Sequence, residues 1–296
     1  MSDLTRPGVV PLRPLTTGEL LDGAVAVLRT RPGRLVGLGV LLAVLEQAVL
    51  FPLRSLVDLD ITLRPGTGRL FEYGWLVVAG FATEAMIIAV LAATAAGRGG
   101  SLLLGRFAPA APRVRWGGVV VVMVAAGAAV ALSVVWYPAL VSALQTLGLF
   151  LAWLLAILLW AVPYGLVGLA APALVLEQRS PGSALVRSLR LASRDWLRAV
   201  RIRVLGYLSW ALVRVGLLLA VIALVTTVWG GNLPSSTWDR LALAAAAAAV
   251  NAVAYPVLGC LDVMLLLEGR MRTEGLDIAL RWALRRGVAP SLEAPR

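Results

Sequence analysis

The stretch that decides the fold is residues 75–97, WLVVAGFATEAMIIAVLAATAAG, which carries a single charged side chain, Glu84. A helix needs about 20 predominantly apolar residues to cross the hydrocarbon core of a bilayer. Five other stretches meet this requirement, so we expect an all-α polytopic membrane helix bundle with six transmembrane helices. The expected spans are residues 35–57, 75–97, 117–142, 146–176, 204–229 and 241–268.

The composition of the whole chain indicates the same lipid environment. Of its 296 residues 60% are hydrophobic and 15% are charged, and the mean hydropathy is +0.87. Soluble domains have about 45–50% apolar and about 25% charged residues. We therefore expect a cytoplasmic N-terminal segment with an amphipathic helix (1–34), a transmembrane domain (35–268) and a cytoplasmic basic tail (269–296).

The residue types that are missing exclude several kinds of catalysis. The chain has no histidine, one cysteine (Cys260) and no lysine, so all 27 basic residues are arginine. Imidazole metal sites, Ser-His-Asp catalysis and Schiff-base chemistry are therefore excluded. We expect a non-enzymatic protein without a catalytic, cofactor-binding or metal site. The net charge of +11 is explained by basic loops at an anionic membrane surface, without nucleic acid.

Arginine is distributed unevenly between the two sides of the expected bundle. Four segments on one side together hold 22 arginines, namely residues 1–34, 98–116, 177–203 and the tail after residue 268. The loops on the other side, 58–74, 143–145 and 230–240, hold three. Positively charged loops remain on the cytoplasmic side of a membrane. We therefore expect a bacterial plasma-membrane protein with both termini in the cytoplasm, where its arginines meet anionic phospholipid headgroups.

The fourth expected span is longer than a bilayer requires. Its residues 146–176 would extend about 46 Å as a straight helix, against a hydrocarbon core of about 30 Å. Pro163 and Gly165 lie near its middle. Two interpretations stay open, namely a kinked helix and a helix broken at Pro163 that lines a cavity.

The N-terminal segment contains a helix-start signal. Thr16 is followed three residues later by Glu19, which is the spacing of a capping box. Leu20, Ala24 and Leu28 then recur at helical spacing. We expect a helix that begins at about Thr17 and lies on the inner membrane surface.

A second amphipathic segment precedes the fifth span. Ser180 and Pro181 are suited to begin a helix. The arginines that follow are three or four residues apart, which places them on one stripe of a helix. The stripe is expected to bind phospholipid headgroup phosphates, and the alternative is an acidic partner or a phosphorylated ligand. Its members are Arg187, Arg190, Arg194, Arg198 and Arg201.

Charged residues inside the expected spans form a candidate intramembrane polar site. Such residues are costly in a bilayer and commonly functional. Glu46 and Arg214 both lie about 15–17 Å from the inner end of their spans, so we predict an ion pair between them. The candidate site consists of Glu46, Glu84, Arg214 and Asp262.

The other charged residues inside the expected spans have either a predicted partner on the same helix or no evident partner. Arg54 and Asp58 are four residues apart and are predicted to pair. Glu84 has no evident partner and is expected to be protonated, and Asp262 is placed near the inner interface. Either these charges form a polar path for an ion, proton or substrate, or they pair between helices and fix the bundle.

Three stretches of the sequence resemble a known family. They are RPLTTGELLDGAVAVLR (13–29), APALVLEQRSPGSALVRSLRLASRDWLRAV (171–200) and EGRMRTEGLDIALR (268–281). They are similar to actinobacterial multi-pass proteins named for the membrane domain of glycerophosphoryl diester phosphodiesterases. The resemblance implies an accessory membrane domain, because the catalytic barrel of those enzymes is a separate soluble domain. The residues that match the family motifs are Gly18, Glu19, Asp22, Arg272, Glu274, Gly275 and Asp277.

These observations lead to a main functional expectation and an alternative. The main expectation is a scaffold or accessory subunit of an envelope- or lipid-related membrane process, with a possible protein partner. The alternative is a transporter or permease subunit with a polar path through the bundle.

Overall fold

The computed structural model describes residues 11–58, 69–104, 112–194, 196–228, 236–286, 288, 291 and 292. The regular structure of this part is helical throughout, and it confirms the predicted all-α bundle. The predicted end of the fifth span at residue 229 and the segments 1–10 and 293–296 lie outside the described residues. The helices are α1 (Thr17–Thr30), α2 (Pro32–Val57), α3 (Leu70–Leu104), α4 (Trp116–Val134), α5 (Tyr137–Val167), α6 (Ala170–Leu176), α7 (Pro181–Arg194), α8 (Trp196–Val228), α9 (Ser236–Glu274) and α10 (Leu276–Arg285).

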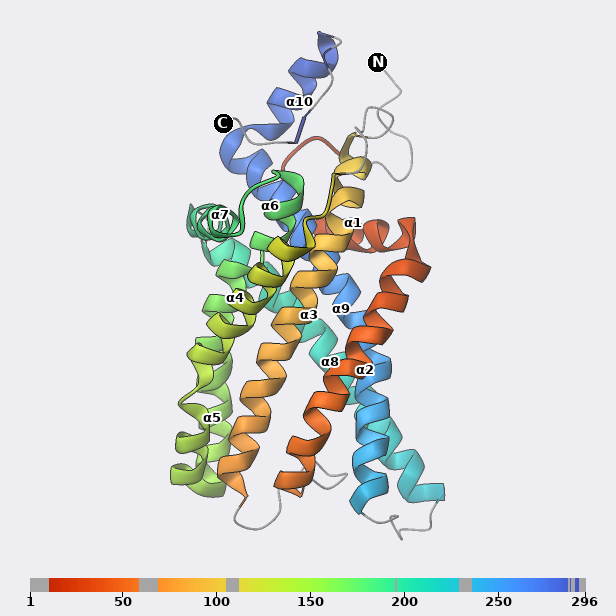
Figure 1. Ribbon diagram of the computed structural model, residues 1–296, viewed down its shortest axis with the longest axis vertical. Helices are drawn as coiled ribbons and strands as arrows, with labels where there is room; N and C mark the ends of the chain where they lie inside the picture. The colour runs from red at the N-terminus through yellow and green to blue at the C-terminus, as the bar shows by residue number, and fades with distance from the viewer. Residues whose placement is uncertain are drawn as a thin grey trace.

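The long helices run side by side, and the short helices gather at one end (Figure 1). Within the described residues, six helical stretches are long and apolar enough to cross a membrane. The short helices α1, α6, α7 and α10 lie together although they come from distant parts of the chain. We call the end that carries these four helices the basic end.

Large apolar side chains cover the outside of the bundle. Leu41 on α2, Val121 on α4 and Leu212 on α8 are exposed, and Leu212 is the most exposed of them at 75%. A soluble protein rarely exposes so much contiguous apolar surface, whereas lipid tails solvate it. The chain is therefore an integral, multi-pass membrane protein in contact with the bilayer.

Helix α9 is the centre of the bundle, since it packs against α1, α2, α3 and α8. Two glycines allow its close approach to α2 and α3. A Cβ atom on Gly259 would lie 2.8 Å from the backbone nitrogen of Ala92 on α3. A Cβ atom on Gly39 of α2 would lie 2.6 Å from the carbonyl oxygen of Ala252 on α9. A larger residue at either position requires the helices to separate.

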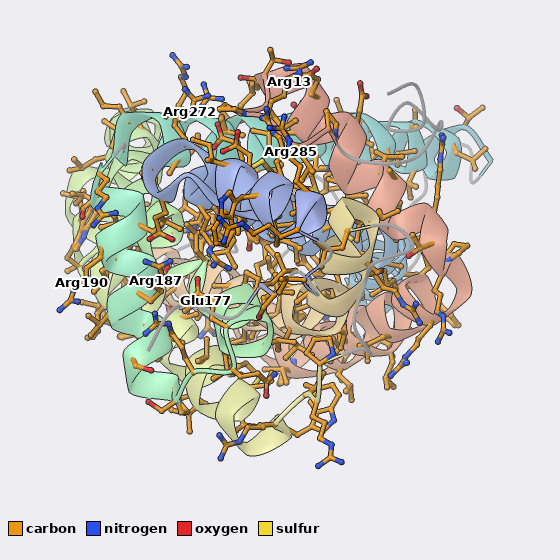
Figure 2. All side chains as sticks on the ribbon, turned by 90° about the horizontal axis from the view of Figure 1, so that it is seen from above. Arg13, Glu177, Arg187, Arg190, Arg272 and Arg285 are labelled. Atoms are coloured by element: carbon orange, nitrogen blue, oxygen red, sulfur yellow. The ribbon has the colours of Figure 1, made fainter. Side chains whose placement is uncertain are left out.

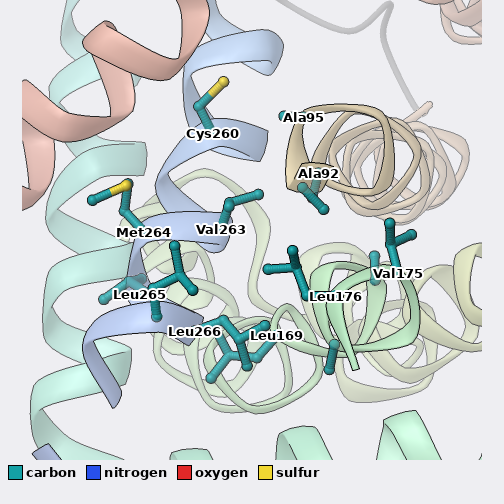
Figure 3. Packing of buried hydrophobic residues seen from close by; sticks show 14 of the residues in the cluster. Ala92, Ala95, Leu169, Val175, Leu176, Cys260, Val263, Met264, Leu265 and Leu266 are labelled. Carbon is teal, nitrogen blue, oxygen red and sulfur yellow. The ribbon is translucent and has the colours of Figure 1, made fainter. Parts of the chain in front are cut away.

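The largest apolar core lies towards the basic end, between α3, α6 and α9 (Figure 3). Every residue of the short helix α6 is buried. Leu169 and Leu176 belong to the same cluster of buried side chains as Val263 and Leu266 of α9 and Ala92 of α3. This core attaches the short helices to the spans.

Helices α4 and α5 meet earlier in the sequence than predicted. The turn lies at Val135 and Trp136, whereas residues 143–145, the predicted loop, are inside α5. The signal for this position is Pro138 in the first turn of α5, where a proline loses no helical hydrogen bond.

Helix α5 continues through Pro163 and ends at Val167, and α6 begins at Ala170. The interruption therefore lies at Gly168 and Leu169, beyond the proline. A Cβ atom on Gly168 would overlap the guanidinium of Arg203, so glycine leaves space for that side chain.

Helix α1 begins at Thr17, as the capping box predicts. Glu19 N donates to Thr16 Oγ1 over 3.3 Å, and Thr16 N donates to Glu19 Oε2 over 2.8 Å. The Thr16 amide and the Arg13 guanidinium hold the pKa of the Glu19 carboxyl below its usual value. The apolar face of α1, with Leu20 and Ala24 fully buried, packs on α9 instead of facing the membrane.

Candidate functional sites in the bundle and at the basic end

Glu46 is buried among neutral hydrogen-bond donors. Tyr255 Oη donates to Glu46 Oε1 over 2.8 Å, and Asn251 Nδ2 donates to Glu46 Oε2 over 2.9 Å. Both donors come from α9, four residues apart on one face. Gln47 Nε2 donates over 3.1 Å, and Thr83 Oγ1 of α3 lies 3.3 Å from Glu46 Oε1. This carboxyl thus ties α2 to α9 and α3.

The predicted Glu46–Arg214 ion pair is wrong. Arg214 Nη1 donates to Glu84 Oε1 over 2.5 Å, and Tyr207 Oη donates to Glu84 Oε2 over 2.6 Å. Glu84 therefore has two partners, contrary to the expectation that it has none. The prediction used depth in the membrane, but depth does not define the side of the helix on which a residue lies.

The two sites are adjacent through Tyr255. The Arg214 Cζ atom lies 5.9 Å from the centroid of the Tyr255 ring, whose hydroxyl donates to Glu46. Of the four predicted polar-site residues, the structure therefore brings Glu46, Glu84 and Arg214 together. These residues join α2, α3, α8 and α9 in one polar core.

The predicted Arg54–Asp58 pair is also wrong. Arg54 Nη2 donates to Gln47 Oε1 over 2.6 Å, and Asp58 pairs with Arg240 Nη1 at 3.2 Å. Helix α2 ends at Val57, and Asp58 takes a left-handed conformation with φ of 51°. Its side chain therefore does not continue the helical spacing that the prediction assumed.

Asp262 belongs to a separate, buried ion pair. Arg203 Nη2 donates to Asp262 Oδ2 over 2.7 Å, and Arg203 Nε donates to Oδ1. The two residues are 3% and 1% exposed, so this ion pair lies inside the bundle. The Arg203 Cζ atom also lies 3.9 Å from the centroid of the Tyr164 ring.

Arg203 is not among the predicted site residues, because residues 177–203 are expected to precede the fifth span. Helix α8 already begins at Trp196. Arg203, Tyr207 and Arg214 are four and seven residues apart, which places them on one face of α8. That spacing was the available signal for a polar face directed at the bundle.

The basic end contains a second polar network, around Glu177 and Glu274 (Figure 2). The Glu177 side chain is 0% exposed and accepts from Arg179 Nε over 2.6 Å and from Arg187 Nε over 3.0 Å. Arg187 Nη2 also donates to Glu274 Oε2 over 2.6 Å, and this bond, with Glu177, raises the pKa of Arg187. Arg270 Nε lies 3.4 Å from Glu177 Oε1. The network connects α7 to the end of α9.

The predicted arginine stripe is divided between two helices. Helix α7 ends at Arg194 and α8 begins at Trp196, so Arg198 and Arg201 are on a different helix from Arg187. Arg198 Nη2 donates to the carbonyl oxygen of Leu15 over 2.8 Å and lies 3.1 Å from Glu268 Oε1. The remaining members of the stripe, all exposed, are Arg190, Arg194 and Arg201.

The family-motif residues lie on α1, in the last turn of α9 and at the start of α10. Gly275, with φ of +64°, separates α9 from α10, and this left-handed conformation favours glycine. Asp277 accepts from Arg281 over 2.8 Å in the first turn of α10, and Arg272 Nε donates to Glu268 over 2.8 Å. Glu274 belongs to the network around Glu177, Glu19 completes the capping box, and Gly18 and Asp22 are exposed on α1.

The fold and these sites define the class of the protein as an integral multi-pass membrane protein. Among the described residues, no three cysteine or acidic side chains gather closely enough to hold a metal ion. Comparisons with protein-family models, with curated proteins and with solved structures find no match to this chain.

Proposed function

We propose that the protein is a non-enzymatic membrane scaffold or accessory subunit of an envelope- or lipid-related process. The observation that carries this proposal is the bonding of the buried carboxylates. Glu46, Glu84 and Asp262 each accept hydrogen bonds from a side chain on another helix. The buried polar groups of the bundle thus form hydrogen bonds that connect neighbouring helices.

The energetics favour such a structural role. A buried charge without a partner is costly, and removal of one member of a buried ion pair costs about 3–5 kcal/mol. Partners on neighbouring helices therefore select one arrangement of the bundle. A rigid bundle of this kind suits a scaffold that presents a surface at the membrane.

The basic end supplies that surface. Arginine-rich segments are retained in the cytoplasm, so we place the basic end and both termini at the cytoplasmic side of a bacterial plasma membrane. There it would meet anionic phospholipid headgroups and an acidic protein partner. The resemblance of the stretches 13–29, 171–200 and 268–281 to an accessory membrane-domain family supports the same role.

The scaffold proposal is tested on the protein extracted from its own membrane with a mild detergent. We expect an assembly that contains a second protein at constant stoichiometry, measured from the mass of the detergent-corrected complex. Purification as a monodisperse species without any partner would count against the proposal.

One observation supports a transporter as a second candidate. Polar side chains follow one another from Arg54 through Gln47 to Glu46, and from Glu46 through Tyr255 to Arg214. A transport path requires water to reach these groups from one side of the membrane at a time.

Solvent access to the polar core separates the two functions. In a Cys260→Ser background, Thr83→Cys places a thiol beside Glu46, and a small membrane-impermeant thiol reagent is applied to cells and to inverted vesicles. Leu212→Cys on the lipid-facing surface is the unreactive control, and Gly182→Cys at the basic end is the reactive one. The scaffold predicts no labelling at residue 83 from either side, and labelling there would make the transporter the better account.

A further inference from the structure

A pocket of about 380 Å³ lies along one flank of α7 at the basic end. Arg187 points from α7 towards Glu177, whereas Arg190 lies at the edge of the molecule (Figure 2). The residues that line the pocket are Arg179, Gly182, Ser183, Val186, Arg187, Arg190 and Arg194. Four of these seven residues are arginines.

The positive charge around this pocket exceeds the negative charge. Arg187 and Arg179 are bonded to Glu177, but Arg190 has no ion pair among the described residues. Arg194 is 56% exposed and lies 3.8 Å from Glu274. With the buried Arg270, five arginines face two glutamates, Glu177 and Glu274, so the described network keeps three unneutralised positive charges.

The glutamates also fix the geometry of the pocket. Glu177 and Glu274 hold the Arg187 guanidinium from two sides, so its position is set before any ligand binds. A guanidinium presents its N–H groups in a rigid fork that matches phosphate oxygens. Gly182 and Ser183 border the same pocket in the first turn of α7, and the start of a helix favours a bound anion.

From this surplus charge and fixed geometry we infer that the α7 pocket binds a phosphate group. The exposed Arg190 and Arg194 guanidiniums supply N–H donors, and the Arg187 guanidinium supplies donors that are held in place. The inference rests on the proposed cytoplasmic position of the basic end, and it names the ligand chemistry of that surface. Such a group comes either from an anionic phospholipid headgroup or from a soluble phosphate compound.

The other flank of α7 favours the phospholipid. Leu185 and Leu189 lie on the side of α7 opposite the arginines, where Leu185 packs against the apolar core and Leu189 is exposed. An amphipathic helix with apolar residues on one flank and arginines on the other lies at the boundary of headgroups and acyl chains. The pocket is then at the level of the lipid phosphates.

The test measures lipid binding by the full chain in detergent micelles, with phosphatidylglycerol and phosphatidylcholine as probes and mass spectrometry of the retained lipid. The variant Arg190→Gln/Arg194→Gln removes both exposed guanidiniums. Arg29→Gln/Arg34→Gln is the matched control, because these two exposed arginines at the same end have no partner among the described residues. Thermal unfolding shows that each variant is folded, which is expected because all four side chains are on the surface.

We expect the pocket variant to lose at least about tenfold in affinity for phosphatidylglycerol, from two charge-assisted hydrogen bonds, and the control to change less than about twofold. If millimolar inorganic phosphate displaces phosphatidylglycerol, the ligand of the pocket is a soluble phosphate compound. If inorganic phosphate does not displace the lipid, the ligand is the phospholipid headgroup. Equal losses in both variants, or no loss in the pocket variant, would overturn the inference. Neither result would affect the scaffold proposal, which is tested by partner stoichiometry and by labelling at residue 83.

Discussion

At the scale of single residues, glycine determines how closely α9 approaches its neighbours. Gly259 lies against the backbone of α3 near Leu91 and Ala92, and Gly39 lies against the α9 backbone. Backbone atoms in two packed helices cannot rotate away as a flexible side chain can. These contacts therefore make the glycines specific requirements of the packing, as in other membrane helix pairs with small residues at the interface.

The substitution Gly259→Ala is expected to lower the free energy of unfolding by about 1–3 kcal/mol, because it overpacks the α3–α9 contact. Gly37→Ala on α2 is the matched control, since no other atom lies within 4 Å of the position that a Cβ atom would take there. Alanine is the better helix former, so the control is expected to be neutral or slightly stabilising. The midpoint of thermal unfolding in micelles measures both, and equal shifts would contradict the packing argument.

The sequence identified the buried charges but not their partners. Glu46, Glu84 and Arg214 were predicted to form a polar site, and the structure brings them together. Depth along a helix follows directly from residue number, but the rotation of each helix about its axis depends on the packing of all its neighbours. The Glu84–Arg214 and Arg203–Asp262 pairs could therefore not be deduced from spacing alone.

At the scale of elements, the residue at which a helix begins was easier to predict from the sequence than the surface on which the helix packs. The Thr16–Glu19 capping box and the Ser180–Pro181 start both mark where helices begin in the structure. These signals are local, because a cap involves side chains within four residues. The surface on which α1 packs and the division of the arginine stripe between α7 and α8 depend on tertiary contacts, so the sequence pattern did not reveal them.

The capping box gives a prediction for α1. Thr16→Ala removes the acceptor of the Glu19 amide, and loss of such a cap costs about 1 kcal/mol. We expect the amides of the first turn of α1 to exchange several-fold faster with deuterium, at about fivefold per kcal/mol. Thr17→Ala is the control, because Thr17 makes no side-chain hydrogen bond among the described residues.

The same cap predicts a dependence on pH. The folded pKa of Glu19 is lowered, so the carboxylate stabilises α1 at a pH above its unfolded pKa. This contribution is lost as the pH falls through the lowered folded value. After correction for the intrinsic exchange rate at each pH, the protection of the first-turn amides is therefore expected to decrease under acidic conditions in the natural chain and to change less in a Glu19→Gln variant.

At the scale of the whole molecule, the charge asymmetry predicts an orientation. In the Cys260→Ser background, a thiol at Gly182→Cys is expected to react only in inverted vesicles. A thiol at Arg69→Cys, at the opposite end of the bundle, is expected to react in intact cells. The reverse pattern would show that the basic end faces outward, and the positive-inside argument would be wrong for this chain.

The all-α membrane bundle could be predicted from the sequence because it follows from apolar run length and composition. The long-range arrangement could not, since it depends on which polar residues meet across helices. Helix α8 shows this clearly, because many of its large apolar residues face outward while Arg203, Tyr207 and Arg214 attach it to α9 and α3. We therefore expect that buried polar contacts between helices hold the bundle together.

That claim is tested most directly by a double-mutant cycle on Glu84 and Arg214. The free energy of unfolding in mixed micelles is measured for Glu84→Gln, Arg214→Gln and the double variant. The exposed Arg69–Glu72 pair serves as the control cycle. Each single variant is expected to lose about 3–5 kcal/mol, with the double variant losing much less than the sum, whereas the control coupling stays below about 1 kcal/mol. Single variants as stable as the natural chain, or strictly additive losses, would contradict the account.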